Sequence, residues 1–223
     1  MRSRIMSGLM IVLLALLTAS AVVAKNSQEA RTTPATISVA MESSRKEAAL
    51  HDAMRKLWED HITWTRLFIV SAVADLPDKA ATTDRLLQNQ VDIGYAIKPY
   101  YGDAAGEKLT ALLKTHITTA AELVAAAKAN DTAKMGDATK RWYANADEIA
   151  AFLSGANPKS WPPAEMKQMM HEHLDLTTAE AVAHLKGNWS DAVAAYDKIH
   201  NQILQMADML TAGIVNQYPA KFK

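Results

Sequence analysis

The stretch that decides the fold is LHDAMRKLWEDHITWTRLF, residues 50–68. Its apolar residues recur at alternating spacings of four and three: Leu50, Met54, Leu57, Trp64 and Phe68. This period places them on one stripe of an α-helix. His61 falls on the same stripe, between Leu57 and Trp64. The stretch therefore predicts an amphipathic helix that carries an imidazole on its buried face.

The same helical period continues through the rest of the chain, and no sustained alternation of β-branched residues predicts a strand. Pro99 is expected to end the second helix at Lys98, because the residue before a proline avoids helical geometry. The predicted helices cover about residues 44–76, 79–98, 103–130, 132–153, 163–187 and 190–218. We therefore predict an all-α fold, an antiparallel helical bundle of about six helices, four long and two shorter.

The N-terminal residues have the pattern of an export signal. Arg2 and Arg4 precede the apolar run 8–17, and small residues end at Ala24. Residues 25–43 are polar, unpatterned and interrupted by Pro34. We predict a signal peptide over 1–24, a flexible linker over 25–43 and one bundle domain over 44–223, in a periplasmic or secreted protein. If the signal is not cleaved, it would serve as the membrane anchor; no other membrane contact is expected.

Composition excludes several classes of function. The chain has no cysteine, which removes disulfide scaffolds, thiolate metal sites and cysteine nucleophiles. It has only 8 glycines and neither of the glycine-rich nucleotide-binding motifs. The 24 basic and 24 acidic residues are interspersed, so no basic face is expected to bind nucleic acid. No nucleophile motif stands out either, and we expect a binding protein rather than an enzyme.

Histidines on the predicted buried stripes are the candidate ligands. His116 lies on the stripe of the third helix, His173 and Glu180 lie on that of the fifth, and His200 lies at the edge of that of the sixth. Buried imidazoles and carboxylates need hydrogen bonds, a metal or a ligand. Imidazoles from facing helices, with a carboxylate, suit a divalent transition metal. We predict His61, His116 and His173 as metal ligands, with Glu180 or His200 completing the site.

The metal could be copper, zinc, iron or nickel. The segment MKQMMHEH, residues 166–173, gathers thioether and imidazole donors, which favour copper. Methionines that fill gaps in a helical core would give the same pattern.

A second hypothesis keeps the same residues without a metal. In it, the protein is a non-catalytic module that binds a small ligand or a partner, and its buried polar residues only fix the packing of the helices. The imidazoles would then bond to threonine, asparagine or backbone carbonyl groups, in a network that includes Asn89, Asn145 and Arg66. Histidines at one depth would favour a shared site, whereas histidines more than about 10 Å apart along the bundle would favour separate roles.

Several segments are similar to those of a family of small exported all-helical proteins: LWEDHITWTRLFIVSAVADLP (57–77), HLDLTTAEAVAHL (173–185) and AAYDKIHNQILQMADML (194–210). The resemblance implies an exported helical bundle and assigns no catalytic residue. Three phrases within the chain also resemble one another: EDHITWT (59–65), KTHITTA (114–120) and HEHLDLTTAE (171–180). They indicate a weak internal similarity.

Overall fold

The computed structural model describes residues 34–223, which contain helices and no strand. The helices are α1 (Pro34–Val73), α2 (Lys79–Tyr101), α3 (Asp103–Lys128), α4 (Thr132–Ala156), α5 (Pro163–Leu185), α6 (Trp189–Gln217) and the short 3-10 turn η1 (Pro219–Lys221). This confirms the predicted all-α bundle. Four of the six helices, α1, α3, α4 and α6, have 25 or more residues, and the two shorter ones, α2 and α5, have 23 each.

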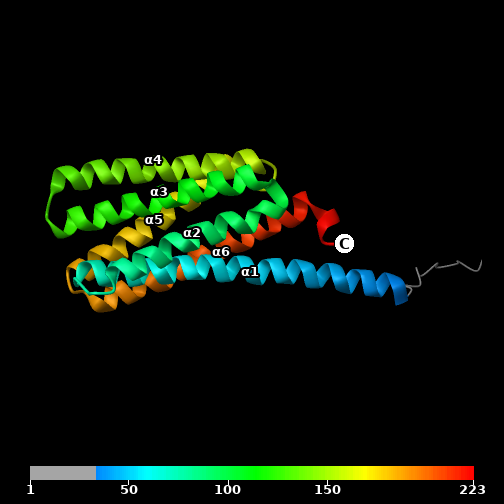
Figure 1. The fold of residues 1–223 in the computed structure, drawn as a ribbon, viewed down its shortest axis with the longest axis horizontal. Helices are drawn as coiled ribbons and strands as arrows, with labels where there is room; N and C mark the ends of the chain where they lie inside the picture. Colours follow the sequence, from blue (N-terminus) through cyan, green and yellow to red (C-terminus); the bar gives the residue numbers. More distant parts are fainter. Residues whose placement is uncertain (1–33) are drawn as a thin grey trace, which may run out of the picture. The chain divides into compact units, whose positions relative to one another are not determined.

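The six helices form a closed ring. Each packs against the next along the chain, and α6 packs against α1 to complete the circuit. Figure 1 shows successive helices running in opposite directions, so α1, α3 and α5 all run the same way. Inside the ring α1 also contacts both α3 and α5. The chain is thus three helical hairpins, α1–α2, α3–α4 and α5–α6, with the first helix of each pointing in one direction.

Two apolar clusters fill the ring. The larger one includes Trp58, Leu113 and Ile203, and the smaller one consists of Phe68, Ile69, Leu86, Ile117 and Val124. Along α3, larger-cluster residues precede His116 and the smaller-cluster residues Ile117 and Val124 follow it; along α1, His61 lies between Trp58 and Ile62 of the larger cluster, and the smaller cluster begins at Phe68. A layer of polar side chains therefore adjoins both clusters.

α1 begins earlier than the sequence pattern predicts. Its first residue is Pro34, so residues 34–43 of the expected flexible linker are helical. Proline is favoured in the first turn of a helix because its missing N–H has no intrahelical partner there. Ser44 consequently lies inside α1 and does not cap it. The predicted signal peptide 1–24 and the rest of the linker lie outside the described residues.

Pro99 does not end α2, which continues for two residues to Tyr101. A proline removes only one backbone donor, and Pro99 sits in the last turn, where its neighbour Tyr95 is largely exposed. The helix stops instead at Gly102, whose φ of 85° favours glycine. No helix within residues 34–223 is long and apolar enough to cross a membrane.

α2 and α3 cross at a pair of glycines. A Cβ atom on Gly94 would lie 2.5 Å from the carbonyl oxygen of Gly106, and one on Gly106 would lie 2.6 Å from the carbonyl oxygen of Gly94. The two backbones therefore touch directly, which only glycine permits at these positions.

Candidate functional site

Three histidines meet in the centre of the ring, one from the first helix of each hairpin. His61 on α1, His116 on α3 and His173 on α5 are 2%, 3% and 4% exposed. The ring centroids of His61 and His173 are 5.7 Å apart. His116 is near enough to both for charge on one ring to affect another. The structure thus brings together the three histidines singled out in the sequence; we call them the histidine triad.

Each ring of the triad is held at Nδ1 by an amide side chain 29 residues further along the chain. His116 Nδ1 lies 3.1 Å from Asn145 Oδ1, and His173 Nδ1 lies 3.2 Å from Gln202 Oε1. His61 Nδ1 lies 3.3 Å from Gln90 Nε2. In every case the amide comes from the second helix of the same hairpin. The equal spacing therefore repeats one ring-to-amide contact three times.

The same amides also bind the backbone one turn before each histidine. Asn145 Nδ2 donates to the carbonyl of Leu112, and Gln202 Nε2 donates to that of Met169. These bonds direct the amide oxygens of Asn145 and Gln202 at the rings. Because an amide oxygen only accepts, Nδ1 of His116 and His173 must carry the proton, and their Nε2 atoms keep a lone pair.

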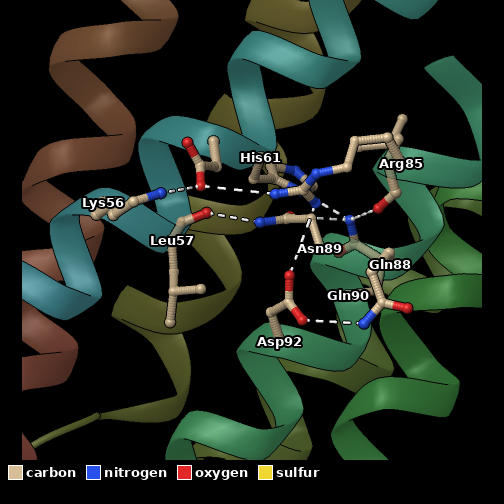
Figure 2. A network of polar contacts seen from close by, with 10 residues as sticks. Lys56, Leu57, His61, Arg85, Gln88, Asn89, Gln90 and Asp92 are labelled. Atoms are coloured by element: carbon tan, nitrogen blue, oxygen red, sulfur yellow. Dashed lines mark hydrogen bonds and ion pairs between the residues drawn. The ribbon is translucent and has the colours of Figure 1, made fainter.

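In the first hairpin, two residues make these contacts: Asn89 binds the backbone carbonyl and Gln90 contacts the histidine ring. Figure 2 shows Asn89 of α2 reaching the carbonyl of Leu57, one turn before His61 on α1. Gln90 contacts the ring, and its Nε2 also donates to Leu86 O at 2.7 Å and to Asn89 Oδ1 at 3.1 Å. Gln90 Oε1 is buried and has no hydrogen-bond partner in the described chain. An amide nitrogen can only donate, so the Gln90 contact, unlike the other two, requires Nδ1 of His61 to be without a proton.

The repeated contact gives the internal similarity a structural basis. The phrases 59–65, 114–120 and 171–180 lie at corresponding points of α1, α3 and α5, each with a triad histidine as its third residue. Four residues after the histidine, Thr65 and Thr177 donate their hydroxyl hydrogens to the carbonyls of His61 and His173. Ala120 occupies this position in α3. The three hairpins are therefore structural repeats, with departures at Ala120 and at the Asn89–Gln90 pair.

Burial keeps the triad neutral. Desolvation, reinforced by His173, lowers the pKa of His116 to about 3. Desolvation lowers the pKa of His173 to about 4. The pKa of His61 is held well below its usual value by burial, then by His173 and His116. Neutral imidazole is the form that coordinates metals.

Two indole groups adjoin the triad without satisfying their own donors. The ring of Trp58 lies 5.7 Å from that of His61, and the ring of Trp142 lies 5.3 Å from that of His116. Both indole Nε1 atoms are buried and have no hydrogen-bond partner within residues 34–223. Buried donors are normally paired, so these two mark a part of the core where polar groups remain available.

Glu180 does not join the triad, contrary to prediction. It is 1% exposed, and its Oε1 accepts a hydrogen bond of 2.5 Å from Arg66 Nη1. Burial raises the pKa of Glu180 to about 7, against the opposing effect of Arg66. Helical phase correctly predicted that Glu180 lies on the buried face of α5. Glu180 lies two turns beyond His173, however, and there it pairs with Arg66 of α1. Arg66 thus takes the role that a metal was expected to fill.

Replacing Arg66 with methionine tests this pair. Arg66→Met is expected to lower the free energy of unfolding by about 2 kcal/mol near pH 8.5, because it leaves an ionised carboxylate buried without a partner. The loss should shrink near pH 5.5, where Glu180 is protonated. Urea denaturation at both pH values measures it. Arg55→Met on the same helix removes the more exposed pair with Asp208 and should cost less than about 1 kcal/mol. Equal losses in the two variants would contradict the prediction.

His200 also lies outside the triad. Its side chain is 36% exposed, and its Nε2 lies 2.7 Å from Glu59 Oε1 on α1. Its position at the edge of the α6 stripe places it at the surface, where it forms an ion pair when protonated. In this structure Glu180 and His200 thus pair with Arg66 and Glu59 of α1 and do not lie with the triad.

The methionines of the segment 166–173 belong to the core. Met166 and Met170 are buried members of the larger apolar cluster, and Met169 packs against it. His171 points elsewhere, with its Nε2 2.7 Å from Asp147 Oδ1 on α4. These contacts are those of gap-filling methionines and a surface histidine.

In the conformation described, no three or more histidine, aspartate or glutamate side chains of residues 34–223 are grouped closely enough to hold a metal ion. Comparison of the chain with protein-family models, with curated proteins and with solved structures finds no match. The function is therefore argued from the geometry of the triad and its surroundings.

Sequence reasoning missed two of the amide partners, Gln90 and Gln202. The signal that identifies them is the constant 29-residue spacing from each triad histidine. Asn89 and Asn145 were expected in a polar network and belong to it.

Proposed function

We propose that this chain is an exported, non-catalytic binding protein that takes one transition metal ion through the Nε2 atoms of His61, His116 and His173. The observation that carries the proposal is the repeated ring-to-amide contact. It occupies Nδ1 of each ring and gives Nε2 no hydrogen-bond partner among the described residues.

Metal-ligating histidines have this arrangement in proteins. A partner on one ring nitrogen fixes the orientation of the imidazole, and the other nitrogen binds the metal. Asn145 and Gln202 fix their rings in the required tautomer. His61 has to adopt the same tautomer, which requires the Gln90 amide to rearrange. That rearrangement would also provide its unpaired Oε1 with a donor.

Metal binding requires the three rings to draw together, because they do not form a closed ligand group in this conformation. The ions considered are copper, zinc, iron and nickel, all of which bind imidazole. The competing explanation is that the polar layer only fixes the packing of the three hairpins. It predicts the same hydrogen bonds and no metal affinity.

Metal titration of the purified chain decides between the two. After chelator treatment, wild type is titrated with copper, zinc, iron and nickel ions and is expected to bind one ion of at least one of them; Co²⁺, as a spectroscopic substitute for Zn²⁺, should give the visible absorption of a low-coordinate nitrogen site. His116→Gln should weaken binding at least about 100-fold, and Asn145→Leu about 10- to 100-fold. His200→Gln is the surface control and should bind like wild type.

Circular dichroism establishes that each variant is helical before its affinity is compared. The proposal fails if folded wild type binds none of the four metals. It also fails if His116→Gln binds as tightly as wild type. In either case, the histidines are structural.

A further inference from the structure

A cavity of about 180 Å³ lies beside the triad. Five helices, α1 to α5, line it, and α6 does not contribute. Its wall includes all five buried residues of the smaller apolar cluster. No charged side chain of the described chain contributes to the wall. A cavity of about 150 Å³ lined by apolar side chains is large enough to bind benzene.

Hydroxyl groups in the wall are largely engaged elsewhere. Thr65 and Thr177 donate to the backbone carbonyls of His61 and His173, at 2.7 Å and 2.8 Å. The Tyr143 hydroxyl donates to Asp175. The hydroxyls of Thr139 and Thr178 also belong to the wall, which is otherwise apolar and uncharged, so burying an ionic ligand there would be unfavourable.

The inner end of the cavity adjoins the histidine layer. Thr65, Ala120 and Thr177, which line it, each follow a triad histidine by one helical turn. Trp142 lines the cavity and also contacts the ring of His116. Its Nε1 is a buried donor with no partner within residues 34–223, so one polar contact is available at this end. Val182, 37% exposed, lies where the wall reaches the surface.

We propose that this cavity binds a small, neutral, aromatic or similarly compact apolar molecule. The size of the cavity sets the limit at about one or two rings, and the uncharged wall excludes carboxylates and amines. This site goes beyond the proposed metal function, because neither its wall nor its ligand requires a metal.

The test titrates the purified chain with toluene in the presence of EDTA and follows amide shifts by NMR. Toluene is expected to perturb residues of the cavity wall saturably. Benzoate, which has the same ring and a negative charge, should bind at least about tenfold more weakly, since its charge would be buried unpaired. His116→Gln should retain toluene binding, which separates this site from the metal site.

Two substitutions place the ligand. Ala120→Leu fills the inner end and should weaken toluene binding at least tenfold, whereas Ala111→Leu, on the exposed face of the same helix, should not. Ala181→Leu on α5 fills the cavity from another wall and replaces Ala120→Leu if that variant does not fold. The proposal is overturned if wild type does not bind toluene, if benzoate binds equally well, or if folded filled variants bind as wild type does.

Discussion

Lowering the pH from about 7.5 to about 5.5 is expected to reduce the free energy of unfolding by about 2 kcal/mol. The triad is the cause. Its histidines stay neutral in the folded chain, because burial lowers the pKa of His116 to about 3 and that of His173 to about 4. In the unfolded chain they take up protons below about pH 6.5. Their stabilisation is therefore complete above pH 6.5 and is lost as the pH falls towards the folded values.

The size follows from proton linkage. At pH 5.5 His116 and His173 each cost about 1.4 kcal/mol, and His61, whose pKa is lowered in the same direction, adds to this loss. Glu180 works in the opposite direction, because its pKa is raised to about 7 and the folded chain holds a proton that the unfolded chain releases. Its contribution is present at low pH and is lost as the pH rises through 7. It offsets about 2 kcal/mol of the acid effect, which leaves the net loss stated above.

Urea denaturation at the two pH values, at constant salt, measures the change. His116→Gln should remove about a third of the histidine contribution, whereas His200→Gln, a change at the surface, should leave the pH dependence of the triad in place. Stability that stays constant or rises on acidification would show that the three rings are not held neutral.

Gly94→Ala is expected to destabilise the fold by about 3 kcal/mol. The added methyl group would lie 2.5 Å from the carbonyl oxygen of Gly106 and would also clash with the Thr110 hydroxyl. A threonine side chain can rotate away, but a backbone carbonyl cannot. The α2–α3 crossing must therefore separate, and the apolar contacts around it weaken. Thermal and urea denaturation measure the loss.

Gly136→Ala on α4 is the matched control. Apart from its chain neighbours and the adjacent backbone of its own helix, no atom of the described chain lies within 4 Å of a Cβ atom placed there. Alanine is favoured over glycine inside a helix, so this variant should gain about 0.5–1 kcal/mol. If both variants changed stability in the same direction, helix propensity rather than the crossing would govern Gly94.

Helical periodicity was sufficient to predict the fold class and the triad. The stripe positions of His61, His116 and His173 indicate which way each side chain faces, and three parallel helices then bring them to one level. The same reasoning failed for Glu180, because phase does not reveal which residue of a neighbouring helix lies opposite. Arg66 was a possible partner by sequence, but its distance from Glu180 depends on how α1 and α5 pack.

Contacts between helices set the remaining features. The cavity arises from small residues such as Ala120 and Ala181 on different helices, and no single stretch of sequence contains it. The start of α1 at Pro34 was missed because a proline within a polar segment fits both a linker and a first helical turn. The role of Gly94 and Gly106 follows from the packing of α2 against α3, so neither glycine could be recognised as a contact point from the sequence.

The repetition of the three hairpins has a consequence for symmetry. With α1, α3 and α5 parallel and alternating with the other three helices, the histidine layer has an approximate threefold axis along the bundle. An occupant on that axis would meet one ring from each of three parallel helices, the arrangement of a trigonal ligand set. One turn beyond, two threonines and Ala120 break the symmetry, so the α3 side differs from the other two. A guest beside the axis would therefore meet a smaller side chain on the α3 side than on the other two, and this difference in shape would favour one orientation.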